Sequence, residues 1–231
     1  MTNLRLADQA PPAKKSRIGL NLAGGGPLGG MYEIGALCAL KESLDGIDFN
    51  ELDVYVGVSV GSLLAASLAN GITPESLYRI MIGHRAAEYS FQPESFLRPA
   101  FREYSQRAKS VPKLVMEAFV TFLANPGNIS LKGAFATLGR AIPTGVFDGD
   151  QIAHMLEQVF QAVGRSNDFR DLSHKLYVIA TDLDSGRSVK FGGKGRDHVP
   201  ISRAVEASCA LPGLYPPVEI DGEFFVDGAL V

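Results

Sequence analysis

The segment at residues 54–70 constrains the fold of this chain more than any other. It begins with VYVGV, a run of β-branched and aromatic residues with the composition of a buried strand. The sequence then passes through GVSVG at residues 57–61 into SLLAASLAN, which predicts a helix that ends before Gly71. A strand, a GxSxG turn and a helix in this order are typical of a nucleophile elbow, which projects a serine at a helix N-terminus. Ser59 is therefore a candidate nucleophile.

Both glycines of this turn have a predicted physical role. A sharp turn from strand to helix needs strained backbone angles, and glycine adopts these more readily than other residues. Glycine also keeps side chains away from the serine. We therefore expect Gly57 and Gly61 to supply the strained angles around Ser59.

The segment before the elbow repeats the pattern of strand, glycine turn and helix. Residues 17–23 have the composition of a buried strand, residues 24–30 are GGGPLGG, and apolar residues at helical spacing follow from Met31 to Leu44. This alternation predicts an α/β fold with a mainly parallel sheet and helices on its faces. Further along the chain we expect a helix that Thr73 caps, with Pro74 at its first position. We also expect helices at 150–160 and 200–208, strands at 175–180 and 187–191, and a hairpin at 218–226.

The glycine run at residues 24–30 supports three interpretations. Backbone N–H groups of Gly24, Gly25 and Gly26, at the start of a helix, can bind one anion, and opposite a serine nucleophile they would form an oxyanion hole. The glycines can also simply form a tight turn. The spacing GxGxxG at residues 24–29 matches a dinucleotide-binding fingerprint as well. A dinucleotide site would place an acid near the end of the next strand, where this chain has Gly57, Val58 and Ser59.

A serine nucleophile needs a base, and the sequence offers histidines and aspartates. Each histidine has a context typical of a structural or surface residue, and none follows the last aspartate, Asp227. Asp182, Asp184 and Asp227 each follow a predicted strand, where aspartate is also a common turn former. The histidines are His84, His154, His174 and His198.

Three motifs, in this order along the chain, resemble the signatures of the patatin-like phospholipase family. They are GGGPLG at residues 24–29, GVSVG at 57–61 and DGA at 227–229. Two further stretches, ATDLDSG at 180–186 and ASCALPG at 207–213, agree with this resemblance. The resemblance covers roughly residues 18–231 and is weak between residues 85 and 143.

The resemblance implies a three-layer α/β/α fold and the hydrolysis of lipid acyl esters by a Ser-Asp dyad without histidine. Carried over, Ser59 is the nucleophile, Asp227 is the base, and the N–H groups around Gly24, Gly25 and Gly26 form the oxyanion hole. The dyad requires no metal and no cofactor.

This chain departs from the family pattern at two places. The family usually has arginine before the last glycine of the first motif, whereas this chain has Leu28, which removes a cation that could contact a phosphate headgroup. The family's domain also continues past the aspartate motif, whereas this sequence ends at Val231. The sequence therefore leaves open a truncated or cleaved product, or a domain that another chain completes.

Composition and charge bear on the binding partners and the cellular location of the protein. The net charge of −3 gives no indication of nucleic-acid binding, and no apolar run reaches the ~18 residues of a transmembrane helix. Two cysteines without metal-type spacing favour reduced thiols, which predicts a cytoplasmic protein. A peripheral contact with a membrane would come from the basic segment at 85–143. Residues 1–16 predict a flexible arm, and residues 17–231 predict the acyl hydrolase domain. Basic residues outnumber acidic ones at 85–143, which predicts a helical lid or cover that could meet lipid.

The sequence thus predicts a serine acyl hydrolase whose substrate is a lipid or another long-chain ester. Two alternatives belong to other classes. One is a non-catalytic module that binds lipid or a protein partner on the same fold. The other is a dinucleotide-binding protein that uses the glycine run.

Overall fold

The computed structural model of this chain describes residues 17–82 and 149–230. The predicted arm at 1–16 and the predicted lid or cover at 85–143 lie outside the described residues. The elements, in chain order, are β1 (Gly19–Leu22), α1 (Gly26–Ser43), β2 (Val54–Val58), α2 (Val60–Ala69), α3 (Pro74–Met81), α6 (Asp150–Phe160), the 3-10 helix η2 (Phe169–Asp171), β3 (Lys175–Asp182), β4 (Ser188–Phe191), α7 (Ile201–Ser208), β5 (Val218–Ile220), β6 (Glu223–Asp227) and the 3-10 helix η3 (Gly228–Leu230).

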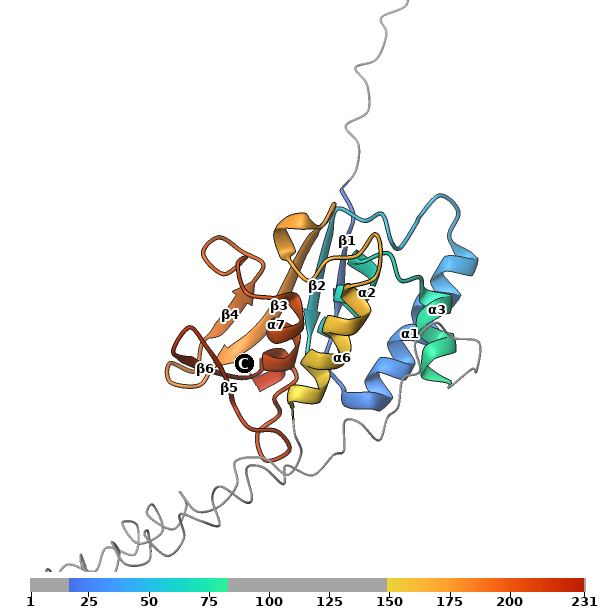
Figure 1. Cartoon of the computed structure of the whole chain (residues 1–231). Coiled ribbons are helices and arrows are strands. Elements are labelled where there is room, and N and C mark those ends of the chain that lie inside the picture. The colour runs from blue at the N-terminus through green and yellow to red at the C-terminus, as the bar shows by residue number, and fades with distance from the viewer. Residues whose placement is uncertain (1–16, 83–148, 231) are drawn as a thin grey trace, which may run out of the picture.

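The strands of the described residues form a single sheet in the order β1-β2-β3-β6-β5, and β4 pairs with β3 off this path (Figure 1). The first three strands are parallel, as the alternation of strands and helices predicts. Strands β4 and β6 both run antiparallel to β3, and β5 forms the predicted hairpin with β6. The predicted α/β class is confirmed, and the parallel strands form the half of the sheet that contains the elbow.

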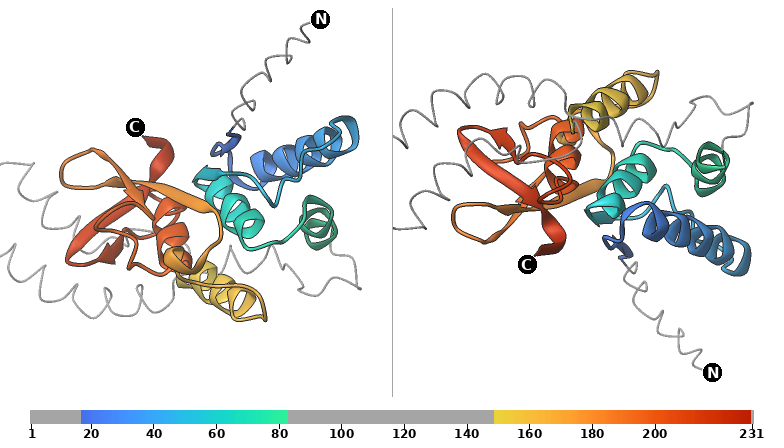
Figure 2. Two further views of the ribbon diagram at one scale, coloured as in Figure 1. Left: turned by 90° about the horizontal axis from the view of Figure 1, so that it is seen from above. Right: turned by 90° about the horizontal axis from the view of Figure 1, so that it is seen from below.

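Helices α2 and α7 pack against the sheet, with α6 against α7 and α1 beside α2 and α3 (Figure 2). Helix α2 is almost entirely buried because it lies between the sheet and these neighbours. Its apolar and small residues therefore contact protein on all sides, which explains its lack of a polar face. The packing around α2 therefore holds its N-terminus, which follows Ser59, in place.

Most predicted boundaries agree with the structure, and two helices begin earlier than expected. Helix α1 begins at Gly26, inside the glycine run, because Pro27 is well suited to the first turn of a helix. Helix α2 begins at Val60, directly after the serine of the elbow. The cap predicted for the third helix is confirmed, since the Thr73 hydroxyl accepts a hydrogen bond from the N–H of Ser76 at 3.2 Å.

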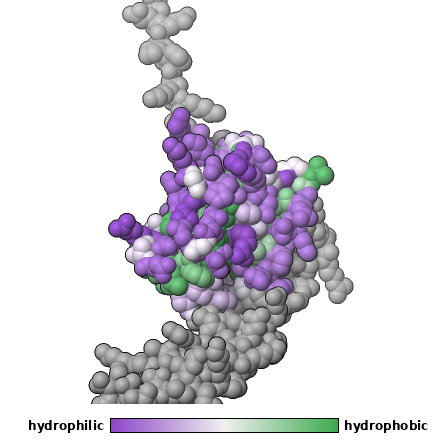
Figure 3. All heavy atoms as spheres, turned by 60° about the vertical axis from the view of Figure 1, so that its left-hand side comes forward, coloured by the Kyte–Doolittle hydropathy of each residue, from purple (hydrophilic) through white to green (hydrophobic). Residues whose placement is uncertain are grey.

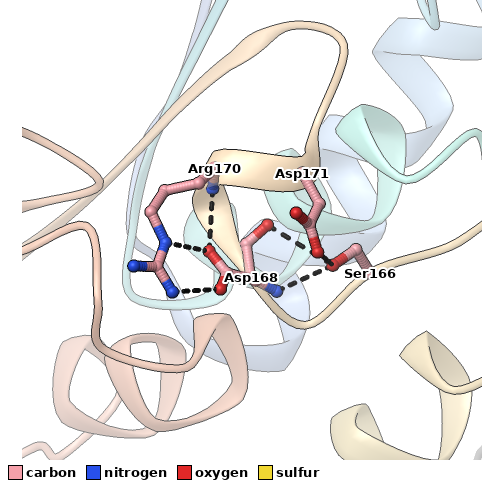
Figure 4. A network of polar contacts seen from close by, with 4 residues as sticks. All are labelled: Ser166, Asp168, Arg170 and Asp171. Atoms are coloured by element: carbon pink, nitrogen blue, oxygen red, sulfur yellow. Dashed lines mark hydrogen bonds and ion pairs between the residues drawn. The ribbon is translucent and has the colours of Figure 1, made fainter.

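The connection between α6 and β3, residues 161–174, forms hydrogen bonds with both α2 and α7. Ser166, Asp168, Arg170 and Asp171 form a compact polar network around η2 (Figure 4). The N–H of Ser166 donates to the Asn70 side chain at the end of α2 at 2.8 Å. The next residue, Asn167, exchanges two hydrogen bonds with Ser202 near the start of α7. These bonds help to fix α7 beside α2.

Candidate active site

The candidate site lies where β2 and β6 meet on one edge of β3. Val58, the last residue of β2, pairs with Ile179, and Asp227, the last residue of β6, pairs with Ala180. Because β4 occupies the opposite edge at both positions, β2 and β6 share the same edge of β3. The two strands run toward each other, so their carboxyl ends meet. This arrangement brings the elbow and the C-terminal aspartate motif together.

The strained residue of the elbow is Ser59 itself, not the glycines. Its φ is 52° and its ψ is −129°, a conformation that residues with a side chain rarely adopt. Gly57 and Gly61 are needed for close packing, because a Cβ on Gly57 would lie 2.4 Å from the Ser62 Cα and one on Gly61 would lie 2.4 Å from the Leu22 carbonyl oxygen. The expectation that the glycines supply the strained angles is therefore wrong, although both positions do require glycine.

Ser59 and Asp227 are in direct contact. The Ser59 hydroxyl donates a hydrogen bond to Asp227 Oδ2 at 2.7 Å, and both residues are buried. Asp227 Oδ1 accepts from the N–H of Ala229 at 2.9 Å, which fixes the plane of the carboxylate. The backbone carbonyl of Asp227 accepts from the hydroxyl of Thr181 at 3.0 Å. Asp227 is thus held at its backbone carbonyl by β3 and at its carboxylate by its own turn.

The glycine run lies directly against this pair. A Cβ on Gly24 would lie 3.2 Å from the Ser59 Cβ and 3.3 Å from the Ala229 Cβ. Gly26 has a φ of +60°, a backbone conformation that favours glycine. The N–H of Ala23, just before the run, donates to Glu33 Oε1 from α1 at 2.7 Å, and burial raises the pKa of that carboxyl. Glu33 therefore anchors the entry to the run, and Gly24 lies closest to the serine.

The described histidines contact surface carboxylates. His174 lies 3.1 Å from Glu51 and His198 lies 2.9 Å from Asp221. His154 lies 3.8 Å from Glu157, and His84 is outside the described residues. Of the other candidate acids, Asp182 accepts from the N–H of Ser185 in a turn at 2.7 Å, and Asp184 is exposed.

Cys209 lies close to the site but is not suited to act as a nucleophile. Desolvation of the thiol, and next the charge of Asp227, raises the pKa of Cys209 to about 12. Since the thiolate is the reactive form, this thiol is unreactive near neutral pH. Ser59 is therefore the better candidate nucleophile of the two.

Comparisons with known proteins identify the family of this chain. A family model described as patatin-like phospholipase matches residues 20–231. The chain belongs to the patatin-like phospholipase family. An uncharacterized protein of Acanthamoeba polyphaga mimivirus is 24% identical over 203 residues, which is 87% of this chain and 55% of that protein. An uncharacterized NTE family protein of Mycobacterium bovis is 39% identical over 54 residues, which is 23% of this chain and 14% of that protein.

A solved structure shares the fold. VipD from Legionella pneumophila superposes with a TM-score of 0.50 at 17% identity, covering 92% of this chain and 46% of VipD. This chain thus spans about half the length of VipD and of the mimivirus relative. In the described part of this patatin-like chain, no helix is both long and apolar enough to cross a membrane.

Three residues of the site were not identified from the sequence. Glu33, Thr181 and Ser208 each make a hydrogen bond that holds the glycine run, Asp227 or Ser59. Ser208 lies in the ASCALPG stretch that resembles the family, but its role depends on a contact with a residue 149 positions away. The residues next to Ser208 in the sequence do not indicate such a contact.

Proposed function

We propose that this chain is a serine hydrolase that cleaves acyl esters of lipids through Ser59 and Asp227. The observation that carries this proposal is the 2.7 Å hydrogen bond from the Ser59 hydroxyl to Asp227, formed at the tip of the elbow. A nucleophile in direct contact with its base fits covalent catalysis. Membership of the patatin-like phospholipase family supports the same chemistry.

The proposed reaction has two halves. Ser59 Oγ attacks the ester carbonyl carbon while its proton passes to Asp227 Oδ2, and the tetrahedral intermediate then expels the alcohol, which takes that proton. Water next attacks the acyl-enzyme and gives a proton to Asp227, which returns it to Ser59 Oγ as the fatty acid leaves. Direct contact allows each proton transfer to accompany the bond change, which suits a carboxylate acting as base.

The proposed oxyanion hole consists of the backbone N–H groups around Gly24, Gly25 and Gly26. Two observations support it: the run starts helix α1, whose N-terminus favours negative charge, and Gly24 lies against Ser59. The Ser59 hydroxyl contacts Asp227, and Gly24 lies beside the same serine. An ester carbonyl bound over the hydroxyl would be expected to meet the N–H groups of the run as well as the base.

Exposed apolar side chains favour a lipid or long-chain ester as substrate. They belong to the same segments as the site: Leu28 on the glycine run is 79% exposed, and Leu230, three residues after Asp227, is 51% exposed. Leu211 and Leu214 are also exposed and follow Ala210, whose carbonyl accepts from the N–H of Asp227. Figure 3 shows hydrophobic patches on an otherwise largely hydrophilic face. Exposed apolar side chains on the segments that carry a polar pair suit acyl chains.

Replacing each member of the pair tests this function. Ser59→Ala and Asp227→Asn should each lower turnover of p-nitrophenyl butyrate at least about 10³-fold, because the two groups act as a unit. Asp184→Asn is the matched control, since it makes the same change at an exposed aspartate after the neighbouring strand. Thermal unfolding checks that all three variants remain folded.

Three outcomes would contradict the proposal. Turnover by Ser59→Ala at the parent rate would remove Ser59 from the mechanism. A severe loss in a folded variant of His84, His154, His174 or His198, each replaced singly by alanine, would indicate a histidine base. A parent protein that a serine-directed fluorophosphonate fails to label would favour the non-catalytic binding module.

We also propose peripheral contact with a membrane surface, on the basis of the basic segment at 85–143, which lies outside the described residues. Each lysine or arginine near an anionic bilayer contributes about 1 kcal/mol, screened by salt. The proposal is tested by hydrolysis of esters in anionic and neutral vesicles at two salt concentrations. Equal rates under all four conditions would contradict it.

A further inference from the structure

The structure contains a buried hydroxyl that neither the dyad nor the glycine run includes. Ser208, the last residue of α7, is fully buried and lies beside the elbow. Its Oγ accepts a hydrogen bond from the backbone N–H of Ser59 at 2.8 Å and donates one to the carbonyl of Ile179 at 2.6 Å. A serine hydroxyl has a single proton, so these two bonds also fix the direction of that proton.

The position of this hydroxyl explains its role. Strand β2 pairs directly with β3 as far as Val58 and Ile179, and Ser59 then turns out of the sheet. The Ser59 N–H is joined to the Ile179 carbonyl through Ser208, so the hydroxyl spans the gap that the turn opens. A buried N–H without an acceptor costs about 1–3 kcal/mol, which would favour relaxation of the turn.

The Ser59 backbone is held on its other side as well. Its carbonyl accepts from the Ser62 N–H at 2.8 Å and from the Ser62 hydroxyl at 2.6 Å. A strained conformation such as φ 52° persists only where the surroundings determine it from several directions. Ser62 acts on the carbonyl side and Ser208 acts on the amide side.

We propose that Ser208 is a positioning residue, which holds the strained Ser59 peptide so that the Ser59 hydroxyl reaches both Asp227 and the substrate carbonyl. This inference rests on the proposed function of Ser59 as nucleophile. Ser208 also engages the Ser59 N–H, which leaves stabilisation of the oxyanion to other donors such as the glycine run. Ser208 acts on the nucleophile and not on the substrate, so its loss should lower kcat and leave KM unchanged.

The test measures the rate at which a fluorophosphonate modifies Ser59, located by mass spectrometry, together with kcat and KM for p-nitrophenyl butyrate. In Ser208→Ala, labelling and kcat should both fall on the order of 10- to 100-fold, because a misplacement of about 1 Å can cost 10²-fold. KM should stay within about twofold of the parent value, since substrate contacts are retained. Ser208→Thr retains the hydroxyl and should recover part of the lost rate.

Ser202→Ala is the matched control. Ser202 is a buried serine on the same helix, and its hydroxyl accepts from Asn167 at 2.9 Å, away from the elbow. The fluorophosphonate should modify Ser59 of the Ser202→Ala variant at the parent rate. If Ser208→Ala does not fold, Ser208→Cys replaces the hydroxyl with a thiol of similar shape that is a weak donor and acceptor, and its labelling should still slow at least about fivefold.

Labelling of a folded Ser208→Ala or Ser208→Cys at the parent rate would overturn the positioning role and leave the proposed function intact. An equal loss in Ser202→Ala would also overturn it, since that would reflect general loosening of α7. A parent that labels at Ser59 but hydrolyses no ester would overturn the proposed function alone. A parent that does neither would overturn both.

Discussion

Replacing Gly24 by alanine adds one methyl group directly beside Ser59. The new Cβ would lie 3.2 Å from the Ser59 Cβ, 3.3 Å from the Ala229 Cβ and 3.9 Å from Ser59 Oγ. Gly24 is not among the glycines with positive φ, so alanine can adopt its backbone conformation. The substitution therefore tests the space beside Ser59 and not backbone strain.

The size of the effect follows from these contacts. Two contacts of 3.2–3.3 Å require Ser59 or Ala229 to move by a few tenths of an ångström, which should cost about 1–2 kcal/mol of stability, as for a modest overpacking. Catalysis should lose more, because the shift would separate Ser59 Oγ from the N–H groups of the proposed oxyanion hole. Loss of one oxyanion-hole donor lowers kcat by about 10²–10³-fold, so a displaced donor should cost about 10²-fold.

The assay compares kcat and KM of the parent, Gly24→Ala and Gly35→Ala on p-nitrophenyl butyrate, with urea unfolding of each. Gly35 is the control, since it is exposed within α1 and a Cβ there would meet nothing within 4 Å. Gly35→Ala should keep full activity and gain about 0.5–1 kcal/mol in unfolding free energy. If kcat of Gly24→Ala remains within twofold of the parent, the glycine run does not form the oxyanion hole as we propose.

Two further predictions concern stability. Burial, opposed by Arg203, raises the pKa of Glu206 to about 7 against a usual 4.5. The contribution of Glu206 to folding stability should therefore be complete below pH 4.5 and fall by about 3 kcal/mol as the pH rises to 7. Urea unfolding of Glu206→Gln across this range should show a smaller fall, and a parent-like pH dependence of this variant would contradict the assignment. Gly61→Ala should destabilise the fold by at least about 3 kcal/mol, because its Cβ would lie 2.4 Å from the Leu22 carbonyl oxygen and 2.5 Å from that of Ala23. A soluble Gly61→Ala protein with parent-like melting would show that the elbow can shift to accept a side chain.

The sequence predicted the elements of this fold because each element has a local signal. The apolar run of β2 and the Thr73 cap of α3 depend only on neighbouring residues, and both appear as expected. The hairpin at residues 218–226 is another case, since Asp221 and Gly222 both have positive φ in its turn.

The sequence alone was less informative about backbone geometry. It identified Gly57 and Gly61 as required, but not the reason, which is close packing against other segments. It also did not show that the strained backbone lies at Ser59. Both features depend on tertiary packing and not on sequence pattern. The role of Ser208 was likewise not predictable from its neighbours. Its partners come from β2 and β3, which only the folded sheet brings together.

The sequence by itself determined which residues could carry the chemistry: a serine in a GxSxG turn, glycines at a helix start, and an aspartate after a strand. The tertiary structure decided that these residues meet. Ser59 and Asp227 are 168 positions apart, and they come into contact because β2 and β6 end head-on along the same edge of β3. Strand pairing of this kind depends on long-range register and direction, and no window of neighbouring residues contains that information.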